Sequence, residues 1–285
     1  MRGDMTTRNA EITFPPRTGL LVVGHGSREQ VGVDEFLATA KQIADLAGDA
    51  AVEPCFLEFA APDIATGLRT LVERGVDRVC VVPLLLFAAG HAKRDIPAAV
   101  AESARAFPSI DICQSRHLGC HPEIVELSNR RYDEALAGRD TISGEETALV
   151  LVGRGSRDSE ATREMRQFAG LRARDARAGR VETAFVAMAE PGLEQMLKGV
   201  ASTGLRRVVV QPHLLFGGVL LDRIAQMVGH RAGQHPETEW IATGRLGPSQ
   251  HVARAALDRA RDTLSAPPEP RPGATVTGDR ALEKH

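Results

Sequence analysis

The chain has 285 residues, of which 43% are hydrophobic and 25% are charged. This length and composition predict two globular domains of about 100 to 150 residues each, and they exclude a disordered or fibrous protein. The 35 basic and 37 acidic residues give a formal net charge of -2. That balance excludes the broad basic field that binds nucleic acid through its phosphates, so we expect no nucleic-acid partner.

Several sequence features indicate the cellular compartment of the protein. Residues 1–17 contain no apolar signal-peptide core, and we expect them to form a flexible N-terminal segment. The longest apolar run, residues 79–89, is too short to span a bilayer. These features predict a cytoplasmic protein without a membrane segment. The four cysteines include no CxxC pair and are predicted to be free thiols: Cys55, Cys80, Cys113 and Cys120.

Short β-branched and aliphatic runs alternate with helical patterns along the chain. Apolar residues recur at helical spacing over residues 36–47 and again over residues 64–71. Alternation of this kind predicts an α/β protein with two doubly wound domains, each built around a parallel sheet. The predicted strands are 19–24, 51–57, 78–86 and 109–114 in the first half, then 148–153, 180–186, 206–215 and 238–243 in the second.

The sequence contains an internal duplication. The motif GHGSR at residues 24–28 is echoed in the second half by GRGSR at residues 153–157. A period this long, seen only twice, indicates two tandem domains and not a solenoid of short repeats. We predict domains at 18–140 and 147–265, followed by a proline-rich disordered tail at 266–285. Further pairs share the displacement of the two motifs: Phe56 with Phe185, Pro62 with Pro191, Gly75 with Gly204, Arg78 with Arg207, Pro83 with Pro212 and Phe87 with Phe216.

Three side chains with metal-binding chemistry follow the first three predicted strands. His25 comes directly after the first strand, Glu58 after the second and His91 after the third. The carboxyl ends of neighbouring parallel strands meet at one edge of a sheet, so a shared site is expected there. Two imidazoles and a carboxylate suit a divalent ion such as Fe(II), Co(II), Ni(II) or Zn(II).

The second half of the chain lacks all three of these side chains. The equivalent positions hold Arg154, Ala187 and Leu220, although the surrounding scaffold residues are retained. Side chains needed for the fold would be needed equally in both halves. Their joint absence therefore indicates a joint role that is confined to the first half.

Several alternatives compete with this interpretation. A lone histidine in a glycine-rich loop is more often a turn or capping residue, and the GxGS loop lacks the spacing of established phosphate-binding motifs. A histidine phosphatase would have arginine before the histidine, where Gly24 stands. His117 and His121 offer a second metal site, but His121 with Pro122 is more typical of a helix start. His213 is predicted to be a core or cleft-wall residue.

Taken together, the motifs resemble those of the sirohydrochlorin chelatases, the class II chelatases of the CbiX/SirB type. The resemblance covers residues 18–265 and implies a fused duplicate in which two flavodoxin-like domains, each with a parallel sheet of about four strands flanked by helices, face a central cleft. The motifs that carry it are GHGSR at 24–28, FLE at 56–58 with Pro62, VPLLLF at 82–87 with Gly90 and His91, DIP at 95–97, and LG at 118–119 before His121 and Pro122.

The resemblance also implies an activity and a site. These enzymes insert Co²⁺ or Fe²⁺ into sirohydrochlorin for cobalamin or sirohaem synthesis, and Ni²⁺ is a further candidate. His25 and His91 match the metal-binding histidines of the family, and Glu58 matches their acidic partner. The same residues are expected to be catalytic, with Glu58 or a histidine accepting the pyrrole protons. A non-enzymatic metal or tetrapyrrole carrier with the same site remains the alternative.

A tetrapyrrole of this class carries many carboxylates, so basic residues on the cleft loops are candidate substrate contacts. Arg28 and Arg157 are the first choices, ahead of Lys93, Arg154 and Arg223. We expect no nucleotide and no iron-sulfur cluster. Because one fused chain supplies both lobes of the cleft, we expect a monomer.

Overall fold

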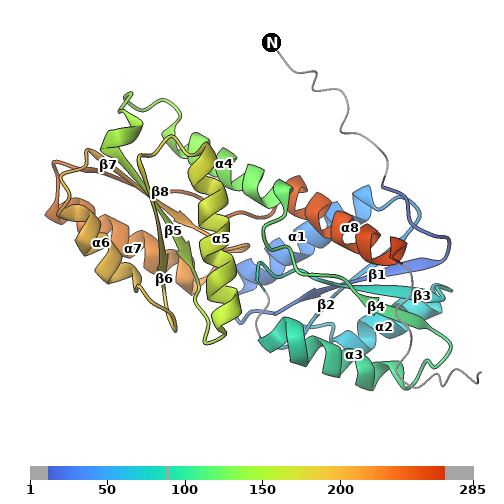
Figure 1. The fold of residues 1–285 in the computed structure, drawn as a ribbon. Helices are drawn as coiled ribbons and strands as arrows, with labels where there is room; N and C mark the ends of the chain where they lie inside the picture. Colours follow the sequence, from blue (N-terminus) through green and yellow to red (C-terminus); the bar gives the residue numbers. More distant parts are fainter. Residues whose placement is uncertain (1–11, 88–89, 267–285) are drawn as a thin grey trace, which may run out of the picture.

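Two four-stranded parallel sheets, each flanked by helices, form two lobes (Figure 1). The computed structural model describes residues 12–87 and 90–266. The first half contains β1 (Thr18–Gly24), α1 (Gln30–Leu46), β2 (Ala51–Phe56), α2 (Ile64–Glu73), β3 (Arg78–Pro83), the π-helical turn η1 (His91–Asp95), α3 (Ile96–Ala104), β4 (Asp111–Gln114) and α4 (Pro122–Leu136). The second half contains the 3-10 turn η2 (Gly144–Glu146), β5 (Thr147–Gly153), α5 (Ser159–Asp175), β6 (Arg180–Phe185), α6 (Leu193–Ala201), β7 (Arg207–Pro212), α7 (Val219–Gln234), β8 (Glu239–Ala242) and α8 (Gln250–Ser265).

The eight predicted strands are all present, and the α/β prediction is confirmed. Two of them end three residues earlier than predicted, at Pro83 in β3 and at Pro212 in β7, whereas the other carboxyl ends agree to within one residue. Buried or partly buried residues continue beyond each proline, LLL at 84–86 and HLL at 213–215, but there the chain leaves the sheet and lines a cleft. A run of apolar residues indicates burial and does not distinguish a sheet from a cleft wall.

The strand order brings the predicted site residues to one edge. In the first sheet the order is β2-β1-β3-β4, and the second sheet repeats it as β6-β5-β7-β8. The central strands β1 and β5 are buried along their whole length, as expected for a parallel sheet covered on both faces. Because β1 lies between β2 and β3, the loops that carry His25, Glu58 and His91 leave the sheet side by side.

The two halves exchange their last helices. Helix α4 of the first half packs against the second sheet, where Gln211 Nε2 of β7 donates to Ser128 O at 2.7 Å. Helix α8 of the second half lies beside α1 on the first sheet (Figure 1), and Arg259 Nη2 donates to Leu118 O at 3.0 Å. The predicted boundaries 18–140 and 147–265 therefore divide the sequence repeats, whereas each lobe in space includes the last helix of the other repeat.

A continuous apolar core joins the lobes. One buried cluster includes Leu20 and Val22 of β1 together with Leu149 and Leu151 of β5, while the opposite face of each sheet has a cluster of its own. An ion pair between Glu35 of α1 and Arg245, beyond β8, adds a polar tie, and Glu35 Oε2 also accepts from Gly217 N at 2.8 Å. The two lobes are consequently packed as one body.

The chain ends are described in part. Ile12 and Phe14 belong to the segment expected to be flexible, yet both pack against the joint core because their side chains are apolar. Residues 1–11 of that segment lie outside the described residues, as do residues 267–285, which are almost all of the predicted tail.

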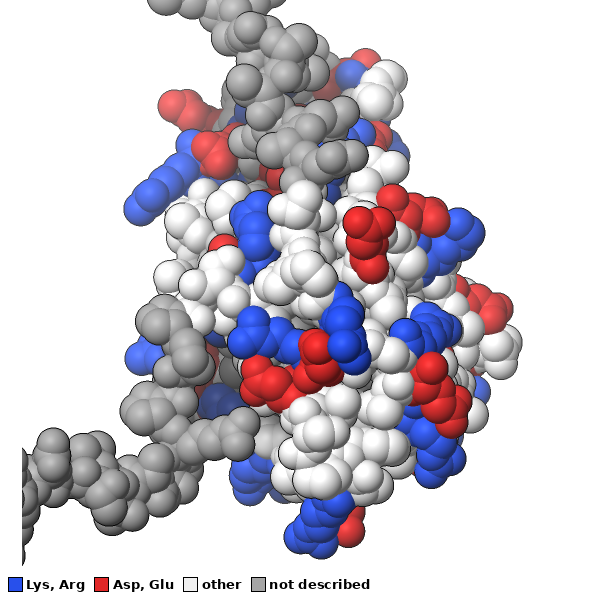
Figure 2. All heavy atoms as spheres, turned by 90° about the vertical axis from the view of Figure 1, so that its right-hand side faces the viewer, with Lys and Arg blue, Asp and Glu red and all other residues white. Residues whose placement is uncertain are grey.

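The outer surface of the first lobe carries both basic and acidic side chains (Figure 2). Figure 2 shows basic and acidic side chains intermingled over the end of the first lobe that faces away from the second, in keeping with the net charge of -2. Across residues 12–87 and 90–266, none of the helices combines the length and apolar character needed to cross a bilayer.

Candidate functional site

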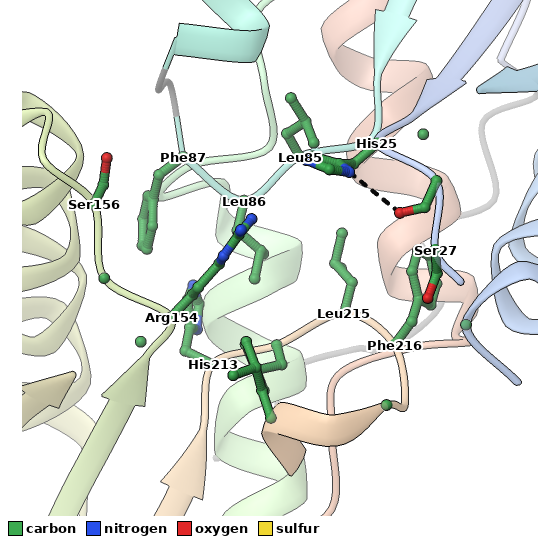
Figure 3. A pocket seen from close by; sticks show the side chains of 18 of the residues that line it. His25, Ser27, Leu85, Leu86, Phe87, Arg154, Ser156, His213, Leu215 and Phe216 are labelled. Carbon is green, nitrogen blue, oxygen red and sulfur yellow. Dashed lines mark hydrogen bonds between the residues drawn. The ribbon is translucent and has the colours of Figure 1, made fainter. Parts of the chain in front are cut away.

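A cleft of about 1000 Å³ opens between the lobes at the carboxyl ends of the strands. This volume is at the upper end of the range for small-molecule sites. Its walls are largely apolar, with Leu85, Leu86 and Phe87 from the first lobe facing Leu215 and Phe216 from the second (Figure 3). The polar groups at the cleft come from the loops after β1 and β5, where Figure 3 shows His25, Ser27, Arg154 and Ser156.

The loop after β1 can adopt its path only with glycine at position 26. Gly26 has φ +92°, and a Cβ at this position would lie 1.7 Å from the carbonyl oxygen of Glu58. The missing side chain lets the two loops touch, and Glu58 N donates to His25 O at 3.1 Å. The contact fixes His25 and Glu58 next to each other at the ends of β1 and β2.

The side chains of His25 and Glu58 meet at this point. His25 Nε2 lies 3.2 Å from Glu58 Oε1, and the exposed fractions of the two side chains are 23% and 40%. Two ligands that bind one ion at about 2.0 to 2.2 Å lie about 2.8 to 3.6 Å apart, for octahedral to tetrahedral angles. The spacing of the pair therefore suits two ligands of one divalent ion.

The geometry of the third predicted ligand remains untested. The backbone of His91 begins the turn η1, but its side chain is outside the described part of the structure. Among the side chains that are described, no group of three or more His, Cys, Asp or Glu residues is close enough to hold a metal ion. The structure thus brings together His25 and Glu58, and the meeting of His25 with His91 stays a prediction.

The second lobe repeats the loop without these side chains. Gly155 has φ +89°, a Cβ there would lie 1.7 Å from Ala187 O, and Ala187 N donates to Arg154 O at 3.0 Å. The backbone arrangement is the same, but Arg154 and Ala187 replace the imidazole and the carboxylate. The histidine–glutamate pair is therefore not required to form this loop.

Three of the predicted substrate-contacting arginines lie at the cleft. Arg28, Arg154 and Arg157 line it and are exposed. The guanidinium carbon of Arg28 lies 5.0 Å from the ring centroid of Phe59, a geometry that favours a cation–π contact. Arg223, on α7, is exposed but is not among the residues found to line the cleft.

Lys93 does not extend freely into the cleft. Its Nζ donates to Asp158 Oδ2 at 2.8 Å and to Glu160 Oε2 at 2.6 Å, both on the second lobe. These bonds raise the pKa of Lys93 and lower the pKa of both carboxyl groups. Lys93 therefore links the lobes across the rim, and this contact competes with the predicted role in substrate binding.

His213 forms part of the cleft wall, as predicted. Its side chain packs against the rings of Phe87 and Phe168, at centroid distances of 5.0 and 4.1 Å. Only 3% of the residue is exposed, and within the described residues neither ring nitrogen has a hydrogen-bond partner. Burial, with a smaller contribution from the charge of Arg172, lowers the pKa of His213 to about 3. The imidazole is neutral at physiological pH.

The histidines near β4 have structural roles. His121 caps the N-terminus of α4, where it accepts from Glu123 N at 3.3 Å, and Pro122 is the first helical residue as predicted. His117 Nε2 lies 2.8 Å from the carboxylate of Glu164 on α5 and so connects the two lobes. These contacts favour the interpretation that they are not a second metal site.

Two exposed apolar residues at the cleft, Phe59 and Met188, were not predicted from the sequence. Each follows the position of Glu58 or its counterpart Ala187, and the two are related by the same displacement as the other repeated pairs. This shared displacement could have identified both residues from the sequence. Neither was predicted, because an apolar residue beside a strand end is more often part of the core.

The fold and the site define a class: two facing α/β lobes, formed by duplication, around a ligand-sized cleft with a histidine–carboxylate pair on one lobe. A sequence model of the CbiX family matches residues 19–135 and 148–263. The chain belongs to the CbiX family, and the two matched segments confirm the internal duplication.

Characterised relatives carry the names that the motifs suggested. A sirohydrochlorin cobaltochelatase from Priestia megaterium is 33% identical over 246 residues, which cover 86% of this chain and 79% of the relative. A sirohydrochlorin ferrochelatase from the same organism is 32% identical over 247 residues, covering 87% and 91%. The solved structure of SirB from Bacillus subtilis with Fe³⁺ superposes with a TM-score of 0.78 at 29% identity, covering 87% of this chain and 96% of that one. These matches confirm the resemblance to the sirohydrochlorin chelatases.

Proposed function

We propose that this protein is a sirohydrochlorin chelatase, which inserts a divalent metal ion, Co²⁺ or Fe²⁺, into the tetrapyrrole. The observation that carries the proposal is the pair of His25 Nε2 and Glu58 Oε1, 3.2 Å apart beside the cleft and present in the first lobe alone. Membership of the CbiX family and the names of the relatives support the same activity.

The metal ion is a substrate, so its site must release it. His25 and Glu58, with His91 as the predicted third ligand, leave coordination positions open to the incoming macrocycle. A site that closed all positions with protein side chains would retain the ion as a structural centre. An incomplete ligand set on the rim of an open cleft therefore suits transfer better than storage.

Insertion also moves protons. Two pyrrole N–H bonds break as metal–nitrogen bonds form, so two protons must leave the macrocycle for a base. Glu58 is the proposed acceptor, because its carboxylate lies beside the metal-binding imidazole and is exposed enough to pass a proton to water. In this proposal Glu58 first holds the ion and then accepts the two protons one after the other, passing each to water.

An anaerobic assay tests the activity. Sirohydrochlorin is mixed with catalytic amounts of the protein and an excess of Co²⁺ or Fe²⁺, and its absorption spectrum is followed. Many turnovers per protein molecule, above the rate without protein, are expected with at least one of the two ions. A change that stops at one equivalent would instead support the carrier alternative, and a rate equal to the protein-free reaction would contradict both.

The arginines on the cleft loops are proposed to bind substrate carboxylates. Arg28→Ala and Arg157→Ala should each raise KM for sirohydrochlorin by about twofold to fivefold and leave kcat within about twofold, because single exposed charge contacts contribute little. Arg223→Ala, on α7 away from the cleft lining, is the matched control. Steady-state kinetics at two salt concentrations checks the prediction, and an unchanged KM in both cleft variants would contradict it.

We further propose that the chain acts as a cytoplasmic monomer without a nucleotide cofactor. Both lobes of the cleft come from one chain, so no second copy is needed to complete the site. The four cysteines are free thiols, which is typical of a reducing compartment.

A further inference from the structure

Phe59 and Met188 occupy equivalent positions in the two lobes and share three unusual properties. Both have a left-handed backbone, with φ +64° and +59°. Both are 52% exposed, although they are large and apolar. Both line the cleft, each from the loop that follows the second strand of its lobe.

Contacts within the fold explain these side chains only in part: Phe59 touches Arg28 and His25, yet half of it stays exposed, as does half of Met188. A left-handed backbone favours glycine or asparagine, because a Cβ is crowded in that conformation. Glycine would therefore form both turns at lower cost and expose less apolar surface to water. Bulky apolar residues that persist in both turns point to a contact outside the chain, because strained residues of this kind gather at ligand sites.

The duplication separates this contact from metal binding. Next to Phe59 the first lobe has Glu58, while next to Met188 the second lobe has Ala187. The metal-binding side chains are present once, whereas the exposed apolar residue is present twice. A ligand that spans the cleft touches both lobes, and a metal ion held on one lobe does not.

The orientation of Phe59 indicates what kind of ligand fits. Its ring lies nearly parallel to the His25 imidazole, at 21° with centroids 5.9 Å apart. The lone pair of Nε2 lies in the imidazole plane, so a flat macrocycle centred on an ion bound there would stand nearly perpendicular to both rings and contact Phe59 edge to face, a geometry that aromatic groups favour. Across the cleft, the flexible thioether of Met188 can adapt to an irregular apolar surface.

We propose that Phe59 and Met188 form an apolar clamp that holds the tetrapyrrole from both lobes and positions its ring over the metal site. The clamp rests on the proposed chelatase function. Both are positioning residues that bind the macrocycle, and neither binds the metal.

Met188 provides the cleaner test, because it is on the lobe without the metal-binding pair. Met188→Gly should weaken binding of metal-free sirohydrochlorin, followed by its fluorescence, by about fivefold to tenfold, since a partly exposed apolar contact is lost. KM should rise by a similar factor, with kcat within about twofold. Met188→Leu should bind as the wild type does. Co²⁺ binding without tetrapyrrole, followed by calorimetry, should be unchanged in both variants.

Two further controls test folding and the specificity of the binding effect. Glycine suits the left-handed backbone at position 188, so the melting temperature of Met188→Gly should equal or exceed that of the wild type. Leu37→Ala, which alters an exposed apolar residue of α1 outside the cleft lining, should leave sirohydrochlorin binding unchanged. Phe59→Gly should weaken binding at least as much as Met188→Gly.

Two outcomes would overturn the clamp and are distinguishable. If the wild type binds sirohydrochlorin and Met188→Gly binds it equally well, the clamp is wrong and the chelatase function stands. If the wild-type protein does not bind sirohydrochlorin at all, the proposed function fails and the clamp fails with it.

Discussion

His25→Ala should lower the rate of Co²⁺ insertion into sirohydrochlorin by about a hundredfold or more, which corresponds to about 2.7 kcal/mol of lost transition-state stabilisation. The variant removes the imidazole whose Nε2 lies 3.2 Å from Glu58 Oε1. Glu58 would then face the ion without its partner on β1. Initial rates under anaerobic conditions measure the effect.

The duplicated loop supplies the control. Arg154 occupies the equivalent turn, so that turn does not require histidine, and the melting temperature of His25→Ala should stay within about 3 °C of the wild type. Arg154→Ala should retain Co²⁺ binding, whereas His25→Ala should lose most of it. Wild-type Co²⁺ affinity in His25→Ala would remove this residue from the site. His91→Ala is expected to behave like His25→Ala.

The second large effect concerns stability and pH. His213→Leu should raise the free energy of unfolding at pH 7 by about 1 to 2 kcal/mol, because the buried imidazole has no partner within the described residues and burying such a group is costly. Leu84 occupies the equivalent position in the first lobe and is only 2% exposed. Leucine is therefore compatible with this position of the fold. Chemical denaturation of both proteins measures the difference.

The pH dependence follows from the lowered pKa of His213. In the unfolded chain this histidine binds a proton near pH 6.5, but in the folded protein its pKa is about 3. Between pH 6.5 and pH 3 the unfolded chain binds more protons at this histidine than the folded protein does. The free energy of unfolding therefore decreases as the pH falls through this range. The loss is about 1.4 kcal/mol per pH unit, or about 3 kcal/mol between pH 6.5 and 4.

The contribution of His213 is isolated by comparison with the variant. Carboxylates also titrate in this range, but they do so equally in both proteins. The difference in unfolding free energy between His213→Leu and the wild type should therefore grow as the pH is lowered from 6.5 to 4. A difference that stays constant over this range would show that the imidazole gains its proton in the folded state.

The strands and the repeats could be predicted from the sequence because each depends on local patterns. β-branched runs such as residues 148–153 indicate strands wherever they pack, and the constant displacement between the repeated motifs needs no structure to be seen. The placement of His25 and Glu58 side by side was also predictable, since both follow neighbouring parallel strands. The position of the His91 side chain is still a prediction.

Other features depend on distant contacts that no local pattern records. The apolar faces of α4 and α8 indicate that these helices are buried, but not that each covers the other half's sheet. Lys93 was a candidate for substrate carboxylates because its partners, Asp158 and Glu160, belong to the other half of the chain. Phe59 and Met188 were overlooked because exposure cannot be read from residue type.

The helix exchange limits how the protein can open. A hinge that swung one lobe away from the other would separate α4 from α8, split the shared apolar core and break the bonds from Glu35 to Gly217 and Arg245. Such a motion exposes buried core and is too costly for each catalytic cycle. We therefore expect the frame to stay rigid and the proposed tetrapyrrole substrate to enter and leave by movements of the rim loops.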